Sequence, residues 1–299
     1  MKKVIRLSES QLNKIVKGAV KDIINIQPPK QHILSEGVQY DNETNTFTFD
    51  FEHDNETDII KLEHIGKKVN AFGRCFYYGY EFAQDVDSQV RTEFIKSVKF
   101  PESFDANNDL KLFIQRAVDY LDSEISLPSY NVVVYPQSLS EINRKMLSYL
   151  SRITTTQYIT IELVKEVASK IEFDYERFDI EILQSKTQNG QPRYTQSQKK
   201  DILSKIQCLM EKLHQHDYFS IARDIKKSKY RQYIKNYYKF PDEKTKLAFQ
   251  ALTNSNVILI DDIVTSGTTM FHMLNTLRCV NDSNAITIFS LIGKNNLSI

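Results

Sequence analysis

The alternation of short apolar runs with amphipathic segments indicates a mixed α/β protein. Four runs are rich in β-branched or aromatic residues and too short for helices, so each predicts a strand of a sheet. Helical spacing of apolar residues follows the first run, in residues 142–150, and begins again at Met270 after the third. Strands that alternate with helices predict a parallel sheet flanked by helices. The four predicted strands are residues 132–135, 178–183, 257–260 and 285–292.

The part of the chain before residue 126 has a pattern typical of α+β structure. Residues 46–51 alternate with period two, and a turn-like segment connects them to residues 58–63, which favours a hairpin. Residues 110–121 have helical spacing. Between these elements, an aromatic cluster favours the core of a sheet, and stacking on a nucleobase is the alternative. The cluster consists of Phe72, Phe76, Tyr77, Tyr78, Tyr80 and Phe82.

The first residues form a separate amphipathic segment. Ser8 and Gln11 have the spacing of a capping box, and Pro28 with Pro29 breaks the helix that follows. We expect this helix to dock on its own domain or on a twin subunit; the alternative is a tether to a partner protein or a membrane surface. The predicted organisation is an amphipathic helix at 1–27, an α+β accessory region at 28–125 and an α/β core at 126–299.

Composition and charge argue against several classes of protein. The 299 residues include 39 Lys and Arg against 38 Asp and Glu, and a net charge of +1 creates no field for nucleic acid or a membrane surface. No apolar run approaches the roughly 18 residues of a membrane span, and no signal peptide is visible. Three cysteines without metal-ligand spacing favour free thiols and a cytoplasmic location. Residues 226–239 are dense in Lys, Arg and Tyr, which favours a solvated amphipathic helix over a surface for single-stranded nucleic acid.

The most informative chemistry follows the strand predicted at 257–260. Asp261 and Asp262 stand where that strand ends, and a loop of small residues leads into the next helix. Free backbone N–H groups and the helix dipole favour an anion at such a joint, and Gly267 allows close approach. The residues that would hold the anion are Thr265, Ser266, Gly267, Thr268 and Thr269. The two carboxylates are suited to sugar hydroxyls or a divalent cation.

Residues 257–269 resemble the phosphoribosyl pyrophosphate (PRPP) signature of type I phosphoribosyltransferases over all thirteen positions. The resemblance implies a Rossmann-like parallel sheet, with Asp261 and Asp262 on the ribose hydroxyls, directly or through Mg²⁺. It also implies that residues 265–269 bind the 5′-phosphate. By the same resemblance, the turn after the strand at 132–135 would bind pyrophosphate through Pro136, Gln137 and Ser138. Strand, proline, serine and helix in succession are common, so this second part is less specific.

Residues 193–198 resemble the ComF group within this family, although this chain lacks the zinc-binding cysteines usual there. A mobile basic loop lies at this place in the family. Arg193 and Lys199 are therefore candidates for catalysis and Lys200 for the pyrophosphate; a solvated basic helix start is the alternative. Thr265 stands where enzymes that use 6-oxopurines have an acid, which disfavours that acceptor class.

The resemblance implies an enzyme that binds PRPP with Mg²⁺ and transfers the phosphoribosyl group to a nitrogen acceptor, a nucleobase or a related compound, releasing pyrophosphate. Type I enzymes are commonly dimers, so a homodimer is expected. Two alternatives stay open: a non-catalytic sensor of PRPP or a nucleotide, and a structural protein that acts through its first helix. The adjacent carboxylates argue against the structural protein, because unpaired neighbouring acids cost stability.

Overall fold

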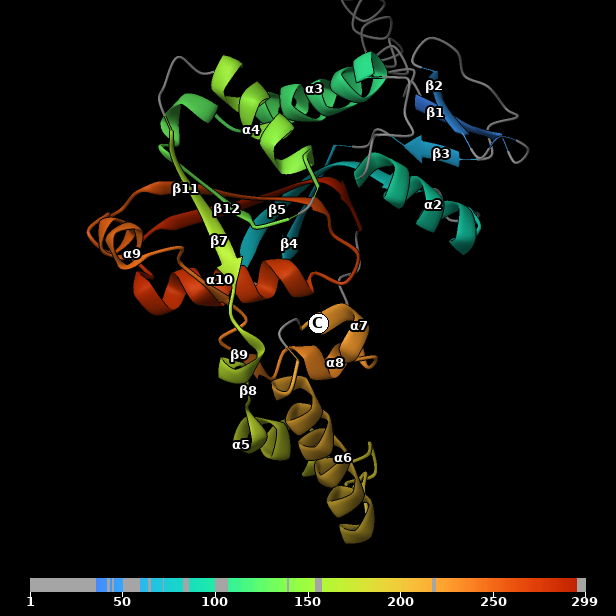
Figure 1. Cartoon of the computed structure of the whole chain (residues 1–299), viewed down its shortest axis with the longest axis vertical. Coiled ribbons are helices and arrows are strands. Elements are labelled where there is room, and N and C mark those ends of the chain that lie inside the picture. Colours follow the sequence, from blue (N-terminus) through green and yellow to red (C-terminus); the bar gives the residue numbers. More distant parts are fainter. Residues whose placement is uncertain are drawn as a thin grey trace, which may run out of the picture.

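The computed structural model describes residues 36–41, 44, 46–50, 60–63, 66–71, 73–82, 86–99, 107–138, 140–153, 158–216 and 219–294. Its centre is a ten-stranded sheet with helices on both faces (Figure 1), which confirms the predicted α/β class with a mostly parallel sheet. The helix expected at residues 1–27 lies outside the described residues. Five neighbouring strands run parallel, in the spatial order β7 (Ile159–Lys165), β6 (Val132–Pro136), β11 (Asn256–Ile263), β12 (Ala285–Gly293) and β5 (Arg74–Phe82).

Antiparallel strands extend the sheet at both ends. β10 (Tyr238–Lys239) pairs with β7 at one end, and β4 (Lys67–Ala71) pairs with β5. Beyond β5 follow β3 (Ile60–Glu63), β1 (Glu36–Asp41) and β2 (Thr46–Asp50). The predicted hairpin between residues 46–51 and 58–63 is wrong, because β1 lies between these two strands and pairs with both. The sequence pattern does not predict β1.

Alternate side chains of the central strands point to opposite faces of the sheet, and each face has its own apolar core. Val133 and Ile258 pack with α3 (Asn107–Glu124) and α4 (Ile142–Ile153), and Val132 and Val257 pack with α10 (Thr268–Val280). Figure 1 shows α3 and α4 above the sheet and α10 below it. Because side chains on both faces of the sheet are covered by helices, the middle residues of β6 and β11 are apolar without interruption.

The aromatic cluster in β5 belongs to the core of the sheet, as predicted. Phe76, Tyr77, Tyr78 and Tyr80 are buried. The Tyr80 ring stacks on Phe113 of α3 at 3.9 Å between centroids, and its hydroxyl donates to the Phe113 carbonyl oxygen at 2.9 Å. These four buried rings therefore cannot stack on a nucleobase. β5 pairs in parallel with β12, so the sheet continues across residue 125, and the division at that residue stays a prediction.

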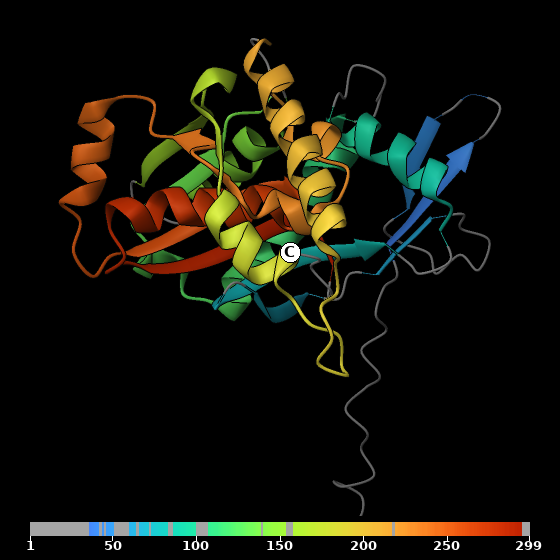
Figure 2. The same cartoon turned by 90° about the horizontal axis from the view of Figure 1, so that it is seen from below.

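A helical extension, residues 166–237, connects β7 to β10, and we call it the arm. Figures 1 and 2 show its longest helix, α6 (Gln196–His214), lying outside the sheet and its covering helices. Thr195 and Gln198 form a capping box at the start of this helix. The other elements of the arm are η3 (Ala168–Lys170), β8 (Glu172–Phe173), α5 (Tyr175–Phe178), η4 (Asp179–Leu183), α7 (Ile221–Asp224), α8 (Ser228–Arg231) and β9 (Ile234–Lys235).

The strand predicted at residues 178–183 is wrong, because this segment is helical. The Asp174 side chain caps α5 by accepting from the Arg177 backbone amide at 3.1 Å, and η4 continues from α5. Phe178 and Leu183 are buried, whereas Ile180 is 58% exposed. The apparent alternation of this segment therefore does not reflect a buried face with period two.

The solvated helix predicted at residues 226–239 is also wrong. Only the four residues of α8 are helical there, and two short strands follow. The tyrosines of this segment are core residues: Tyr230, Tyr233, Tyr237 and Tyr238 are all buried. The remaining described helices are α2 (Ser88–Lys99), η2 (Leu127–Ser129) and α9 (Glu243–Gln250).

Candidate functional site

A cleft of about 640 Å³ opens where β6, β7 and β11 end, and it gathers residues from both halves of the chain. Parallel strands end at one edge of a sheet, which is where α/β proteins usually bind ligands. Six residues singled out by the sequence line this cleft: Pro136, Gln137, Ser138, Asp261, Asp262 and Thr269. Those it did not single out are Lys99, Ser140, Arg144, Glu162, Lys165, Tyr238 and Ile263.

The two adjacent acids are almost completely buried at the end of β11. Asp261 is 5% exposed and Asp262 is 2% exposed. The Asp262 backbone amide donates to Asp261 Oδ1 at 3.0 Å, and the Ile263 amide donates to Asp262 Oδ1 at 2.6 Å. Burial, and then the charge of Asp262, raise the pKa of Asp261 well above its usual range. A cation or hydroxyl donors that bind here would offset the cost of burying charge on this pair.

Lys99 brings a cation to this acid pair from the accessory half of the chain. Its Nζ lies 3.0 Å from Asp262 Oδ2, and its side chain is 30% exposed. Phe94 and Val98, both fully buried, anchor the same helix, α2. No local motif in the sequence marks Lys99, because its role depends on where α2 packs. One lysine facing two carboxylates leaves the pair with one negative charge when both are ionised.

The loop after β11 has the geometry of an anion site. Gly267 has φ 80° and ψ 1°, and it is the N-cap of α10. Ser266 Oγ and Thr268 Oγ1 lie 2.8 Å apart, and the Val264 amide ties the loop to β12 through Ile292 O at 2.9 Å. The N–H groups of the first turn of α10 have no partner inside the helix and carry the positive end of its dipole. An anion can therefore bind at this end of α10.

Replacing Gly267 with alanine should weaken anion binding about tenfold and cost about 1–2 kcal/mol of stability, because φ 80° is strained for a residue with a Cβ. Titration of inorganic phosphate and thermal unfolding would measure the two effects. Gly190→Ala is the matched control: Gly190 has φ 76° in the arm, and an added Cβ there would contact nothing within 4 Å. The control should lose similar stability and keep phosphate affinity. Equal phosphate affinity in the two variants would contradict this prediction.

Three backbone amides in and just after the turn that follows β6 are hydrogen-bonded within the protein. The Gln137 amide donates to Leu163 O of β7 at 2.7 Å, and the Ser140 amide donates to Ser138 Oγ at 3.1 Å. The Ile142 amide donates to Ser140 Oγ at 3.3 Å. The side chains of Gln137 and Ser138 are exposed to the cleft. An anion here would meet these side chains together with Arg144 and Lys165.

Arg193, Lys199 and Lys200 lie on the arm and are not among the residues that line the cleft. The Arg193 amide closes a turn by donating to Ser185 O at 3.0 Å, and the two lysines lie in the first turns of α6. Arg193 and Lys200 are exposed, and Lys199 is half-buried. Their assignment to catalysis and to pyrophosphate stays a prediction.

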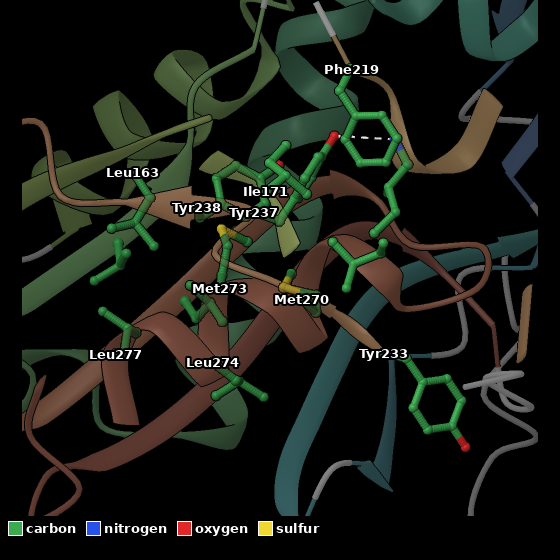
Figure 3. Packing of buried hydrophobic residues seen from close by; sticks show 14 of the residues in the cluster. Leu163, Ile171, Phe219, Tyr233, Tyr237, Tyr238, Met270, Met273, Leu274 and Leu277 are labelled. Carbon is green, nitrogen blue, oxygen red and sulfur yellow. Dashed lines mark hydrogen bonds between the residues drawn. The ribbon is translucent and has the colours of Figure 1, made fainter. Parts of the chain in front are cut away.

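Buried aromatic residues join the arm to the floor of the cleft. Tyr238 lines the cleft, and burial raises its pKa well above the usual value. Its neighbour Tyr237 accepts from the Ile221 amide of α7 at 3.4 Å, the contact dashed in Figure 3. His272 Nε2 lies 3.0 Å from the Arg231 carbonyl oxygen, and burial lowers the pKa of His272 to about 4. A neutral His272 therefore connects α10 to the arm.

A larger cavity of about 810 Å³ lies beside the cleft, between β10, α9 and α10. Ionic contacts already engage its charged side chains: Lys235 Nζ lies 2.8 Å from Asp174 Oδ2, and Lys239 Nζ lies 2.8 Å from Glu166 Oε1. None of the residues that the sequence assigns to PRPP lines it, although part of the stretch 226–239 does. Chemistry therefore favours the smaller cleft as the candidate site.

The cleft suits a metal that brings part of its own coordination. Within the described ranges, no group of three or more His, Cys, Asp or Glu side chains could hold a metal ion. Mg²⁺ is commonly bound by one or two carboxylates, with water and substrate phosphates completing its shell. Asp261 and Asp262 fit that pattern. No helix in the described part of the chain is long and apolar enough to cross a membrane.

The chain matches no family model, and no curated protein matches it. Among solved structures, a hypoxanthine phosphoribosyltransferase from Staphylococcus aureus is similar, with 11% sequence identity and a TM-score of 0.30. The match covers 63% of this chain and 68% of that chain. A likeness at this TM-score carries no argument about function, so a functional conclusion must rest on the residues of the cleft.

Proposed function

We propose that this protein is a phosphoribosyltransferase that binds PRPP with Mg²⁺ and transfers its phosphoribosyl group to a nitrogen acceptor. One observation carries the proposal. The buried pair Asp261 and Asp262, the loop at the start of α10 and the turn after β6 lie together at one edge of the sheet. A ligand with a sugar diol between two phosphate groups needs these three features side by side. The likeness of residues 193–198 to the ComF group is not part of the proposal.

Each part of PRPP has a place in this arrangement. The 5′-phosphate binds at residues 265–269, where the helix dipole and free amides favour an anion. The ribose hydroxyls donate to Asp261 and Asp262, with Lys99 beside Asp262. Gln137 and Ser138 hold the pyrophosphate, together with Arg144 and Lys165. Substrate binding at both ends positions the C1 carbon between the acid pair and the pyrophosphate site.

In the reaction, the C1–O bond to pyrophosphate breaks, and both electrons of that bond leave with the pyrophosphate. The lone pair of the acceptor nitrogen forms the new C1–N bond, and the proton of an N–H acceptor passes to solvent. Negative charge grows on the leaving group, so Arg144 and Lys165 stabilise the transition state by their position. Asp261 and Asp262 would hold Mg²⁺, which supplies further charge neutralisation for the pyrophosphate when bound.

Calorimetric titration of PRPP with Mg²⁺ tests the proposal directly. Binding should be saturable, and ribose 5-phosphate and pyrophosphate should each compete for part of the site. Release of pyrophosphate that depends on an added nitrogen heterocycle would establish transfer. Tight PRPP binding without pyrophosphate release for any acceptor would indicate a sensor instead. Failure of PRPP to bind would refute both functions.

The cations that surround the cleft can be compared with those of the arm. We expect the double change Arg144→Gln with Lys165→Gln to weaken pyrophosphate binding at least tenfold, because both side chains line the cleft. The double change Arg193→Gln with Lys199→Gln removes the same charge from the arm and should leave the affinity within about twofold, since neither side chain lines the cleft. Titration of Mg²⁺-pyrophosphate measures both. A larger loss in the arm variant would support the assignment made from sequence.

A further inference from the structure

A second cavity, of about 500 Å³, lies beside the start of the loop at residues 265–269. α2 and the ends of β5 and β12 enclose it, and Ile263 lines both this cavity and the cleft. Thr265, the first residue of the loop at 265–269, lines it as well. The cavity is therefore adjacent to the acid pair and to the place proposed for the ribose.

One face of α2 serves both spaces. Arg91, Ile95 and Lys99 are spaced four residues apart, so they lie along one stripe of the helix. Arg91 and Ile95 line the cavity, and Lys99 lines the cleft. Two compounds bound at the same time in the cleft and in the cavity would therefore lie against the same helix face.

The walls of the cavity suit a flat ring. Phe82, at the end of β5, is half-buried, and the Phe94 ring holds it in an edge-on contact at 5.8 Å. The Arg91 guanidinium lies 5.7 Å from the centroid of the Phe82 ring. Ile95, Ile263 and Ile292 supply apolar surface. Aromatic and branched side chains around a cavity favour planar ligands, with polar groups that fix their orientation.

The charged groups of the cavity favour a planar ligand with a negatively charged substituent on its edge. Arg91 and Lys294 contribute two positive charges, and Glu81 contributes one negative charge. The Tyr78 hydroxyl lies 3.4 Å from Glu81 Oε2 and can donate to it, which directs part of that carboxylate toward β5. A guanidinium binds a carboxylate with two parallel hydrogen bonds, which gives both strength and orientation.

We propose that this cavity is the acceptor site and that it takes a planar nitrogen heterocycle carrying a carboxylate. The inference rests on the proposed function, because it gives the acceptor a place next to C1 of the ribose. Phe82 supports the ring, Arg91 and Lys294 bind the carboxylate, and the stripe on α2 aligns the acceptor with the cleft. Phe82 is also the one described member of the aromatic cluster that lines this cavity.

The test uses two matched pairs of probes with the full chain and saturating ribose 5-phosphate. The pairs are pyridine-3-carboxylate with its amide, and a pyrimidine-2,4-dione with and without a 6-carboxylate. Ligand-observed NMR titration should give at least tenfold tighter binding for one carboxylate than for its uncharged partner. Arg91→Gln should remove this preference. Phe82→Leu should weaken both members of the pair about tenfold, and Phe82→Tyr should restore binding.

Controls separate this inference from the proposed function and from misfolding. Each variant should keep its affinity for PRPP with Mg²⁺ and its thermal unfolding midpoint, and Lys205→Gln on the arm should change nothing. Equal or tighter binding of the uncharged probes would overturn the inference, as would unchanged binding in Phe82→Leu. Absence of all heterocycle binding while PRPP binds would overturn it too. Loss of PRPP binding in the wild type would instead refute the proposed function.

Discussion

The double change Asp261→Asn with Asp262→Asn is expected to reduce PRPP affinity at least a hundredfold while leaving the fold intact. Asparagine keeps the Oδ1 acceptors that the amides of Asp262 and Ile263 use. It removes the buried negative charge, which is needed to bind the ligand and Mg²⁺. In the unliganded protein, the same charge costs desolvation energy. We expect the free energy of unfolding to change by no more than about 1 kcal/mol, since relief of the buried charge on Asp261 is offset by loss of the Lys99–Asp262 ion pair.

Calorimetry with PRPP and Mg²⁺, together with urea unfolding at pH 7, measures both effects. Asp201→Asn on the exposed face of α6 is the matched control, because it removes a carboxylate that pairs with Lys205 outside the cleft. The control should bind PRPP as the wild type does. Retained PRPP affinity in the double variant would remove the basis of the proposed function. A large loss of stability would instead mean that the acid pair supports the fold.

Acidification from pH 6.5 to pH 4 should lower the free energy of unfolding by about 3 kcal/mol through His272 alone. Burial lowers the pKa of His272 from 6.5 to about 4 in the folded protein. The unfolded chain therefore takes up the proton first, so falling pH favours unfolding across this window, at 1.36 kcal/mol per pH unit of difference. The raised pKa of Asp261 acts in the opposite sense, since its charged form is the costly one.

The comparison of the wild type with His272→Gln isolates this contribution. Glutamine can still donate to the Arg231 carbonyl oxygen that His272 Nε2 contacts. Urea unfolding at pH 7, 5.5 and 4 should show a smaller loss of stability in the variant, and the difference should develop between pH 6.5 and 4. A difference that stays constant with pH would mean that His272 is not held neutral in the fold.

The elements that could be predicted from sequence are those whose pattern is local. β6, β11 and β12 are short apolar runs covered on both faces, and the helices that follow β6 and β11 have clear amphipathic spacing. Residues 178–183 misled because three alternating apolar residues fit a strand as well as a helical turn. No strand was predicted at β7, although residues 159–165 have an ordinary strand pattern.

The site divides in the same way. Asp261, Asp262 and the loop at 265–269 are contiguous, so one motif contains them all. Lys99, Arg144 and Lys165 come from three separate elements. Which cations face the acids depends on how α2, α4 and β7 pack around the end of β11, and that arrangement is set by long-range contacts. The candidates chosen by proximity in the chain, such as Arg193, lie on the arm instead.

The pairing of β5 with β12 has a consequence for how the protein is made. Phe76 lies opposite Ile288, so two adjacent strands come from positions about two hundred residues apart in the order of synthesis. During translation, β5 cannot pair with β12 until β12 has left the ribosome. Until then, the edge of β5 that pairs with β12 has no partner, and its aromatic residues are not covered there. Contacts so distant in sequence also slow folding. The nascent chain should therefore depend on chaperones until β12 emerges, and stop codons ahead of residue 285 should yield insoluble products.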